Sequence, residues 1–167
     1  MNETLLLIVW HSRTGASEQL AIAAESAALE QCPMVGAVRR LCCEDATPED
    51  LLAARGYLFI CPENLAAIAG LMKEFFDRSY YPLLGKIEAR PYASIISAGS
   101  DGENASRQLA RIATGWRLKA AQASLIINTA AQTPEEILAP KKLLAEQLNQ
   151  AAELGAALAA GIEMGIY

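Results

Sequence analysis

A loop near the N-terminus has residue types that suit a phosphate group. Its hydroxyl side chains belong to Ser12, Thr14 and Ser17, and Gly15 permits a tight turn. The loop follows a short apolar segment, residues 5–10, and precedes an alanine-rich segment that is typical of a helix. Free N–H groups and the dipole at a helix N-terminus favour an anion, so this position predicts a phosphate site. An ordinary helix cap rich in Ser and Thr would have the same composition.

Two later loops also follow short apolar segments. Residues 57–61 lead to Pro62, and residues 92–98 lead to Gly99. The carboxyl ends of parallel strands meet at one edge of a sheet, and ligands bind there, where the strand order reverses. We therefore expect the loops that begin at His11, Pro62 and Gly99 to line one site.

Apolar segments alternate with segments of helical periodicity along the whole chain. We expect strands over residues 5–10, 34–41, 57–61, 92–98 and 120–127. We expect helices over residues 16–30, 51–54 and 103–114, one after Pro62 that extends to about Tyr81, and one that begins at Ala139 and Pro140. Parallel strands need right-handed crossover connections, so the alternation predicts one α/β domain over residues 1–167. Its five-stranded parallel sheet would have the order 2-1-3-4-5, with helices on both faces.

The composition limits the partners. The net charge is −5 and the pI is about 4.9, so we expect no nucleic acid, which needs clustered Lys and Arg. The apolar run over residues 5–10 is far shorter than the roughly 20 residues that span a membrane, so we expect no membrane contact. The 4 cysteines form no C-x-x-C pair and there is 1 histidine, so we expect free thiols and no metal site. These features indicate a soluble cytoplasmic protein.

Other functions of this fold class need residues that the chain lacks. A low-molecular-weight phosphatase needs a nucleophilic Cys in the first loop, and that loop has none. A response regulator needs acidic residues at the end of the first strand, where Trp10 and His11 stand. The nucleotide-binding pattern G-x-x-x-x-G-K-[ST] is also absent.

The three loops together resemble the flavodoxin family, in particular its branch of FMN-dependent NAD(P)H oxidoreductases similar to NADPH-dependent FMN reductases. The first loop matches the phosphate pattern [ST]-x-T-G-x-[ST]. The second match is Cys61-Pro62-Glu63-Asn64, followed by Gly70, Lys73, Phe75, Phe76 and Asp77. The third is Ser97-Ala98-Gly99-Ser100-Asp101-Gly102. The resemblance implies a flavodoxin-like three-layer sandwich with FMN as the cofactor.

The resemblance also implies a role for each loop. The first loop would hold the phosphate through Ser12, Arg13, Thr14, Gly15, Ala16 and Ser17. The second would border the isoalloxazine ring and ribityl chain through Pro62, Glu63, Asn64 and Leu65. The third would approach the pyrimidine edge of the ring through Ala98, Gly99 and Ser100. No catalytic side chain is assigned, because the flavin itself carries the chemistry.

The chain departs from electron-carrier flavodoxins in one respect. Carriers usually cover the flavin ring with aromatic side chains from the second and third loops, but residues 62–66 and 99–105 contain none. An uncovered ring admits a nicotinamide or a quinone, unless Trp116, Tyr80 or Tyr81 covers it from elsewhere in the chain or from a second subunit. His11 for proton transfer and Cys61 for redox chemistry are further candidates, with a plain loop residue and an inert buried thiol as the simpler interpretations.

Two functions follow from the resemblance. The first is an FMN-binding oxidoreductase that passes electrons from NADPH or NADH to a small acceptor such as a quinone or a flavin. The alternative is a flavodoxin-like electron carrier that does not itself oxidise NAD(P)H. A small-molecule electron acceptor is the expected partner, and the resemblance implies a homodimer.

Overall fold

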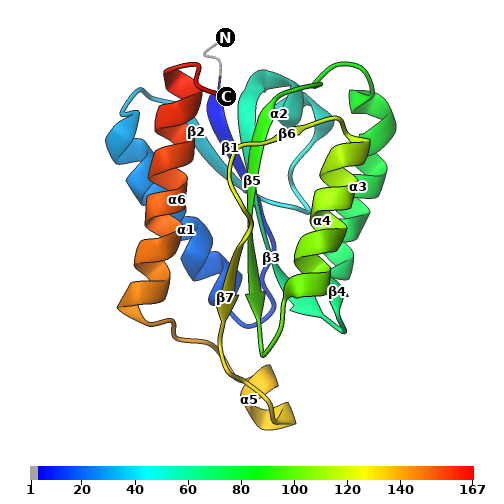
Figure 1. Cartoon of the computed structure of the whole chain (residues 1–167), viewed down its shortest axis with the longest axis vertical. Coiled ribbons are helices and arrows are strands. Elements are labelled where there is room, and N and C mark those ends of the chain that lie inside the picture. The colour runs from blue at the N-terminus through cyan, green and yellow to red at the C-terminus, as the bar shows by residue number, and fades with distance from the viewer. Residues whose placement is uncertain (1–3) are drawn as a thin grey trace.

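A twisted, mainly parallel sheet forms the middle layer of the molecule, with helices on both faces (Figure 1). The computed structural model describes residues 4–167. The strands are β1 (Thr4–Trp10), β2 (Val38–Cys42), β3 (Ala54–Asn64), β4 (Ala67–Ile68), β5 (Pro91–Ala98), β6 (Lys119–Ala120) and β7 (Leu125–Asn128). The helices are α1 (Ala16–Gln31), α2 (Pro48–Ala53), α3 (Gly70–Leu83), α4 (Glu103–Gly115), α5 (Pro134–Leu138) and α6 (Ala145–Glu163).

The strand order is β2-β1-β3-β5-β6, with β7 also paired to β5 and β4 paired antiparallel to β3. The predicted α/β sandwich is confirmed, and its sheet carries two additions. The expected strand 120–127 is divided into β6 and β7, and a short hairpin extends β3. The division occurs at the edge of the sheet, where Ser124 bonds to the Ser94 hydroxyl at 2.9 Å and Gln122 bonds to the Tyr167 hydroxyl at 3.3 Å.

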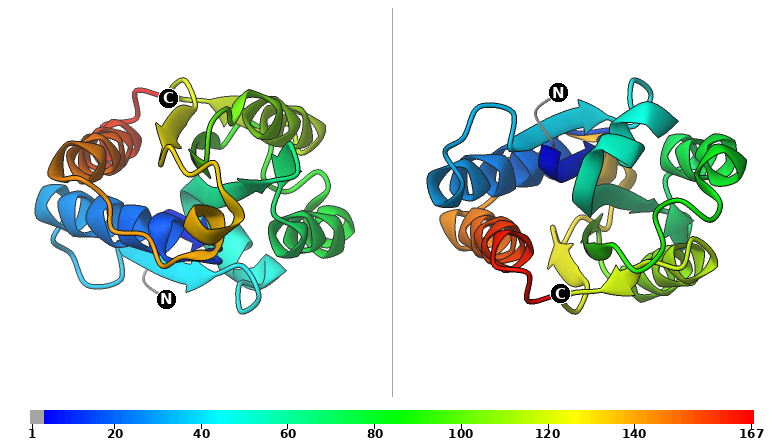
Figure 2. Two further views of the ribbon diagram at one scale, coloured as in Figure 1. Left: turned by 90° about the horizontal axis from the view of Figure 1, so that it is seen from below. Right: turned by 90° about the horizontal axis from the view of Figure 1, so that it is seen from above.

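Two hydrophobic cores lie on opposite faces of the sheet. Helices α1 and α6 lie side by side over one face, and α3 and α4 cover the other (Figures 1 and 2). The β1 side chains alternate between the cores, with Leu6 and Ile8 on the α1–α6 side and Leu7 and Val9 on the other. All of these side chains are fully buried, which explains why the β1 segment is a continuous apolar run.

The expectation that a strand ends at Pro62 is wrong. Strand β3 continues to Asn64 and turns back through β4, so Ile68 belongs to a strand and the helix begins only at Gly70. The Ile60 carbonyl accepts from His11 N–H at 2.9 Å, and residues two apart point to the same side of a strand. A backbone N–H at position 62 would therefore point to the side of β1 but past its last residue. A proline, which has no N–H, consequently loses no hydrogen bond between strands at this position.

The last helix also begins later than expected. Helix α6 starts at Ala145 rather than at Ala139 and Pro140, and α5 precedes it. The backbone N–H of Lys141 donates to Thr14 O at 2.7 Å, and that of Leu143 donates to the Gln19 side chain at 3.2 Å. These bonds to the first loop and α1 hold the segment in an extended path.

Smaller boundary shifts occur at β2 and α2. Strand β2 begins at Val38 instead of Met34, and α2 covers Pro48–Ala53 instead of residues 51–54. Among residues 4–167, no helix combines the length and apolar character needed to cross a bilayer.

Candidate functional site

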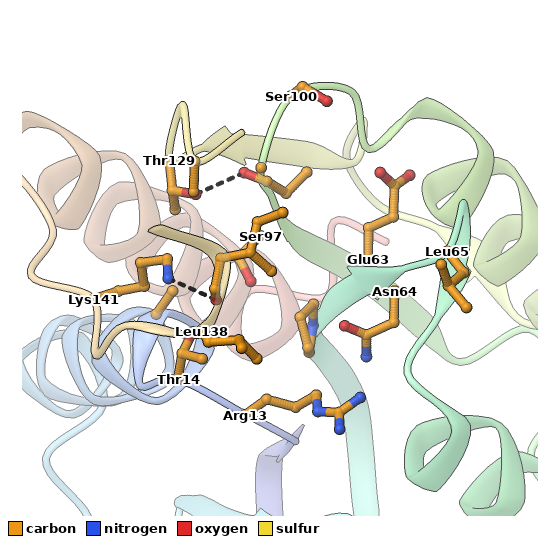
Figure 3. Close-up of a pocket in the computed structure, with 16 residues that line it drawn as sticks. Arg13, Thr14, Glu63, Asn64, Leu65, Ser97, Ser100, Thr129, Leu138 and Lys141 are labelled. Carbon is orange, nitrogen blue, oxygen red and sulfur yellow. Dashed lines mark hydrogen bonds between the residues drawn. The ribbon is translucent and has the colours of Figure 1, made fainter. Parts of the chain in front are cut away.

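A cavity of about 410 Å³ opens at the carboxyl ends of β1, β3 and β5, where the three predicted loops meet (Figure 3). Its lining includes these predicted residues: Arg13, Thr14, Ala16, Pro62, Glu63, Asn64, Leu65, Ala98, Gly99 and Ser100. It also includes residues that we did not assign from the sequence: Ser97, Thr129, Ala131, Ile137, Leu138 and Lys141. The predicted residues outside the lining are Ser12, Gly15 and Ser17.

The first loop is shaped by its own side chains. Gly15 is the N-cap of α1 with φ of 93°, a left-handed conformation that favours glycine. The Ser12 hydroxyl accepts from Gly15 N–H at 3.0 Å, and the buried Ser17 hydroxyl bonds to the Ser97 hydroxyl on β5 at 2.8 Å. Ser12 and Ser17 therefore fix the loop. Thr14, Arg13 and the N-terminus of α1 remain on the cavity side to meet an anion.

His11 is buried at the end of β1 and does not line the cavity. Burial lowers its pKa from the usual 6.5; Glu44 opposes this shift and Arg13 adds to it. The imidazole is therefore mainly neutral at pH 7 and adds little positive charge beside the loop.

The second wall of the cavity is the β3–β4 hairpin. Leu65 and Ala66 form its turn with φ of 49° and 61°, the positive values that a type I′ turn requires. Helix α4 holds the hairpin in place, because Ile68 N–H donates to the Gln108 side chain at 2.8 Å and the Asn104 side chain donates to Ala66 O. Leu65 is left fully exposed at the rim.

Glu63 supplies an unusual acceptor on this wall. Its Oε2 is buried and has no hydrogen-bond partner within residues 4–167. Buried polar atoms are nearly always hydrogen-bonded, so this oxygen is suited to receive an N–H or O–H donor from a ligand.

The third loop is in close contact with the chain after β7. A Cβ atom at Gly99 would lie 2.6 Å from Ala131 O, so only glycine fits there without displacement. Thr129 N–H and its hydroxyl both donate to Ala98 O, at 2.8 and 3.1 Å, and the Asn128 side chain donates to Ser100 O at 2.6 Å.

Residues 129–141 form a wall that the sequence-based predictions missed. Helix α5 projects from the sheet at this edge, and its Leu138 lies near Thr14 and Lys141 in the cavity (Figures 1 and 3). A sequence signal was available. Thr133-Pro134-Glu135-Glu136 has a Thr cap, a Pro and two acids, the same pattern as Thr47-Pro48-Glu49-Asp50 at the start of α2, and both segments form capping boxes.

Among residues 4–167, no aromatic side chain lines the cavity. Trp116, Tyr80 and Tyr81 instead line a separate cavity of about 460 Å³ between α3 and α4, and Trp116 packs on Phe75 and Phe76. The suggestion that these residues cover a flavin ring from within the chain is therefore wrong.

Cys61 also lies outside the site. It is fully buried on β3, and this burial raises its pKa to about 12. The thiol stays protonated at neutral pH, which agrees with the interpretation of an inert buried cysteine.

No protein-family model matches the sequence, and no curated protein does so. Many solved structures share the fold. A flavodoxin from the domain Archaea superposes with a TM-score of 0.77 at 15% identity, covering 96% of this chain and 99% of that one. The flavodoxin WrbA-like protein from Agrobacterium tumefaciens gives 0.70 at 18% identity, covering 96% and 98%. Rubredoxin oxygen:oxidoreductase from Desulfovibrio gigas gives 0.74 at 12% identity, and the match covers 98% of this chain but 38% of that enzyme.

These similarities define the class of the protein, which has a flavodoxin-like fold. Because the sequence identities are low, the similarities establish the fold alone, and the function has to be argued from the residues of the site.

Proposed function

We propose that this chain binds FMN in the cavity and transfers electrons through it. The observation that carries the proposal is that one cavity joins the N-terminus of α1, a position that favours an anion, to the walls formed by the β3–β4 hairpin and the third loop. The cavity volume of about 410 Å³ falls in the usual range for small-molecule sites, roughly 300–1,000 Å³.

The residues present fit this cofactor. The N–H groups in the first turn of α1 and the hydroxyl of Thr14 would bind the phosphate, and Arg13 would add a positive charge. Glu63 would accept a hydrogen bond from the ring or the ribityl chain at its unpartnered oxygen. Gly99 lets the third loop lie close to the edge of the ring. Once bound, the flavin would supply hydride and electron transfer.

NADPH or NADH is the electron donor in this proposal, and a small molecule such as a quinone or a flavin is the acceptor. The described part of the chain contributes no aromatic side chain to the cavity lining, which supports this proposal because no aromatic ring then competes with a nicotinamide for the flavin. Within the D. gigas oxidoreductase, the same fold is one part of a larger chain.

A carrier without NAD(P)H oxidation is the second candidate. Leu65 at the cavity rim is fully exposed and Leu138 is 76% exposed. Apolar side chains beside a redox site suit transient contact with a protein partner. The two candidates share the cofactor and differ in the electron donor.

The first test is the visible spectrum of the protein after incubation with FMN and desalting. We expect retained flavin absorbance, which NADPH or NADH should bleach under anaerobic conditions if the protein is an oxidoreductase. Retention without bleaching would favour the carrier. No retained flavin would overturn the proposal.

Thr14→Asp tests the position of the phosphate. A carboxylate about 4 Å from the phosphate costs roughly 4 kcal/mol at an effective dielectric constant near 20, so the Kd for FMN should rise at least tenfold. Riboflavin, which lacks the phosphate, should bind Thr14→Asp about as well as the wild type. Asn149→Asp adds the same charge on the exposed face of α6 and is the control. Equal losses for both ligands would contradict the assignment of the first loop.

A further inference from the structure

Helix α5 has two apolar side chains, Ile137 and Leu138, but does not pack them into a core. None of its residues is buried, and residues 132–140 are all exposed. Ile137 is 49% exposed and Leu138 is 76% exposed, yet both line the cavity. An isolated helix of this length is unstable in water, so α5 needs an additional contact to persist.

The hydrogen bonds of α5 mainly tie the segment to itself. Glu136 accepts from the N–H groups of Gln132 and Thr133, at 2.9 and 3.1 Å. The Lys141 ammonium donates to the carbonyls of Glu136, Ile137 and Ala139 at 2.6, 3.0 and 2.7 Å. Residues 129–141 thus form a cap at one side of the cavity, and Ile137 and Leu138 are its apolar side chains that line the cavity.

The two ends of this cap are attached to the two loops that flank the cavity. Thr129 bonds to Ala98 at one end. At the other end, Lys141 N–H donates to Thr14 O at 2.7 Å, and the Gln19 side chain donates to Lys141 O and Gly15 O, both at 2.8 Å. The cap is therefore attached to the proposed phosphate loop.

We propose that α5 is the wall on which the isoalloxazine ring packs, with Ile137 and Leu138 in contact with the ring in place of aromatic side chains. This inference rests on the proposed FMN site and names the residues that complete it. The ring would cover the exposed apolar surface of α5, and α5 would in turn become more ordered.

Leu138→Ser tests the contact. Loss of about half the burial of a Leu side chain should raise the Kd for FMN roughly tenfold. Ile166→Ser is the matched control, because Ile166 is 63% exposed and lies outside the cavity. It should bind FMN as tightly as the wild type.

Hydrogen exchange of the α5 amides gives a second measurement on the wild-type protein. FMN should slow exchange over residues 134–141, whereas inorganic phosphate, which can occupy only the first loop, should slow it much less. Unchanged exchange with FMN, or equal Kd values for wild type and Leu138→Ser, would overturn the role of α5 while leaving the FMN site standing. Failure of the wild type to bind FMN would overturn both proposals.

Discussion

Gly155→Ala is a substitution for which local preference and tertiary packing predict opposite results. Gly155 lies inside α6, where alanine is favoured over glycine by about 1 kcal/mol. In the folded protein, however, a Cβ at this position would lie 2.4 Å from Ala24 O and 2.8 Å from Ala24 Cα, both backbone atoms of α1.

The packing cost should exceed the helix preference. Backbone atoms cannot rotate away from a new methyl group, so α6 must shift from α1 by nearly 1 Å. Overpacking of this kind costs about 1–3 kcal/mol, and a backbone clash belongs at the upper end. The net loss in the free energy of unfolding is then about 2 kcal/mol, which lowers Tm by roughly 4–8 °C in a chain of this size.

Urea and thermal unfolding of the purified protein would measure this loss. Gly70→Ala is the control, because Gly70 begins α3 and a Cβ added there would meet nothing within 4 Å. It should be as stable as the wild type or slightly more stable. If Gly155→Ala also matches or exceeds the wild type, the close contact between α1 and α6 does not limit stability and the reasoning fails.

Two further predictions concern the site. Burial holds the pKa of His11 below 6.5 in the folded protein, so the unfolded chain binds the proton more readily and the free energy of unfolding falls as the pH drops below about 6.5. Urea unfolding of His11→Gln apoprotein at pH 7.5 and 5.5 should show a smaller fall than the wild type; an equal fall would assign the pH dependence to other groups. Gly99→Ala should displace the turn at Ala131 and raise the Kd for FMN roughly tenfold, since its Cβ would lie 2.6 Å from Ala131 O. Titration of Gly99→Ala beside Gly70→Ala checks this, and unchanged affinity would show that the turn adapts freely.

The central strands and the flanking helices could be predicted because their local patterns agree with their environment. The apolar run of β1 is buried on both faces, and α4 begins and ends at glycine-bearing turns close to the expected residues. Most of the predicted site residues meet in one cavity, because the carboxyl ends of parallel strands share one edge of the sheet. Their binding of FMN stays a prediction.

The errors occurred where a distant segment decides the local structure. Pro62 remains inside β3 because β1 has already ended beside it, which the local sequence does not reveal. Residues 139–144 have an extended path because Thr14 and Gln19, more than a hundred positions earlier, bond to their N–H groups. Trp116 packs among the aromatic residues of α3 and away from the site, which depends on the relative position of two helices.

The sequence by itself determined the layered α/β class, the order of the main strands and the loops that meet at the site. These properties follow from hydrophobic periodicity, which is a local pattern, and from the right-handedness of crossover connections, which is a general rule for parallel strands. Only the tertiary structure decided that α5 forms a wall of the cavity, that Ser17 joins α1 to β5 and that a Glu63 oxygen is left without a partner among residues 4–167. These features depend on contacts between segments far apart in the chain, whose geometry is fixed only when the layers pack together.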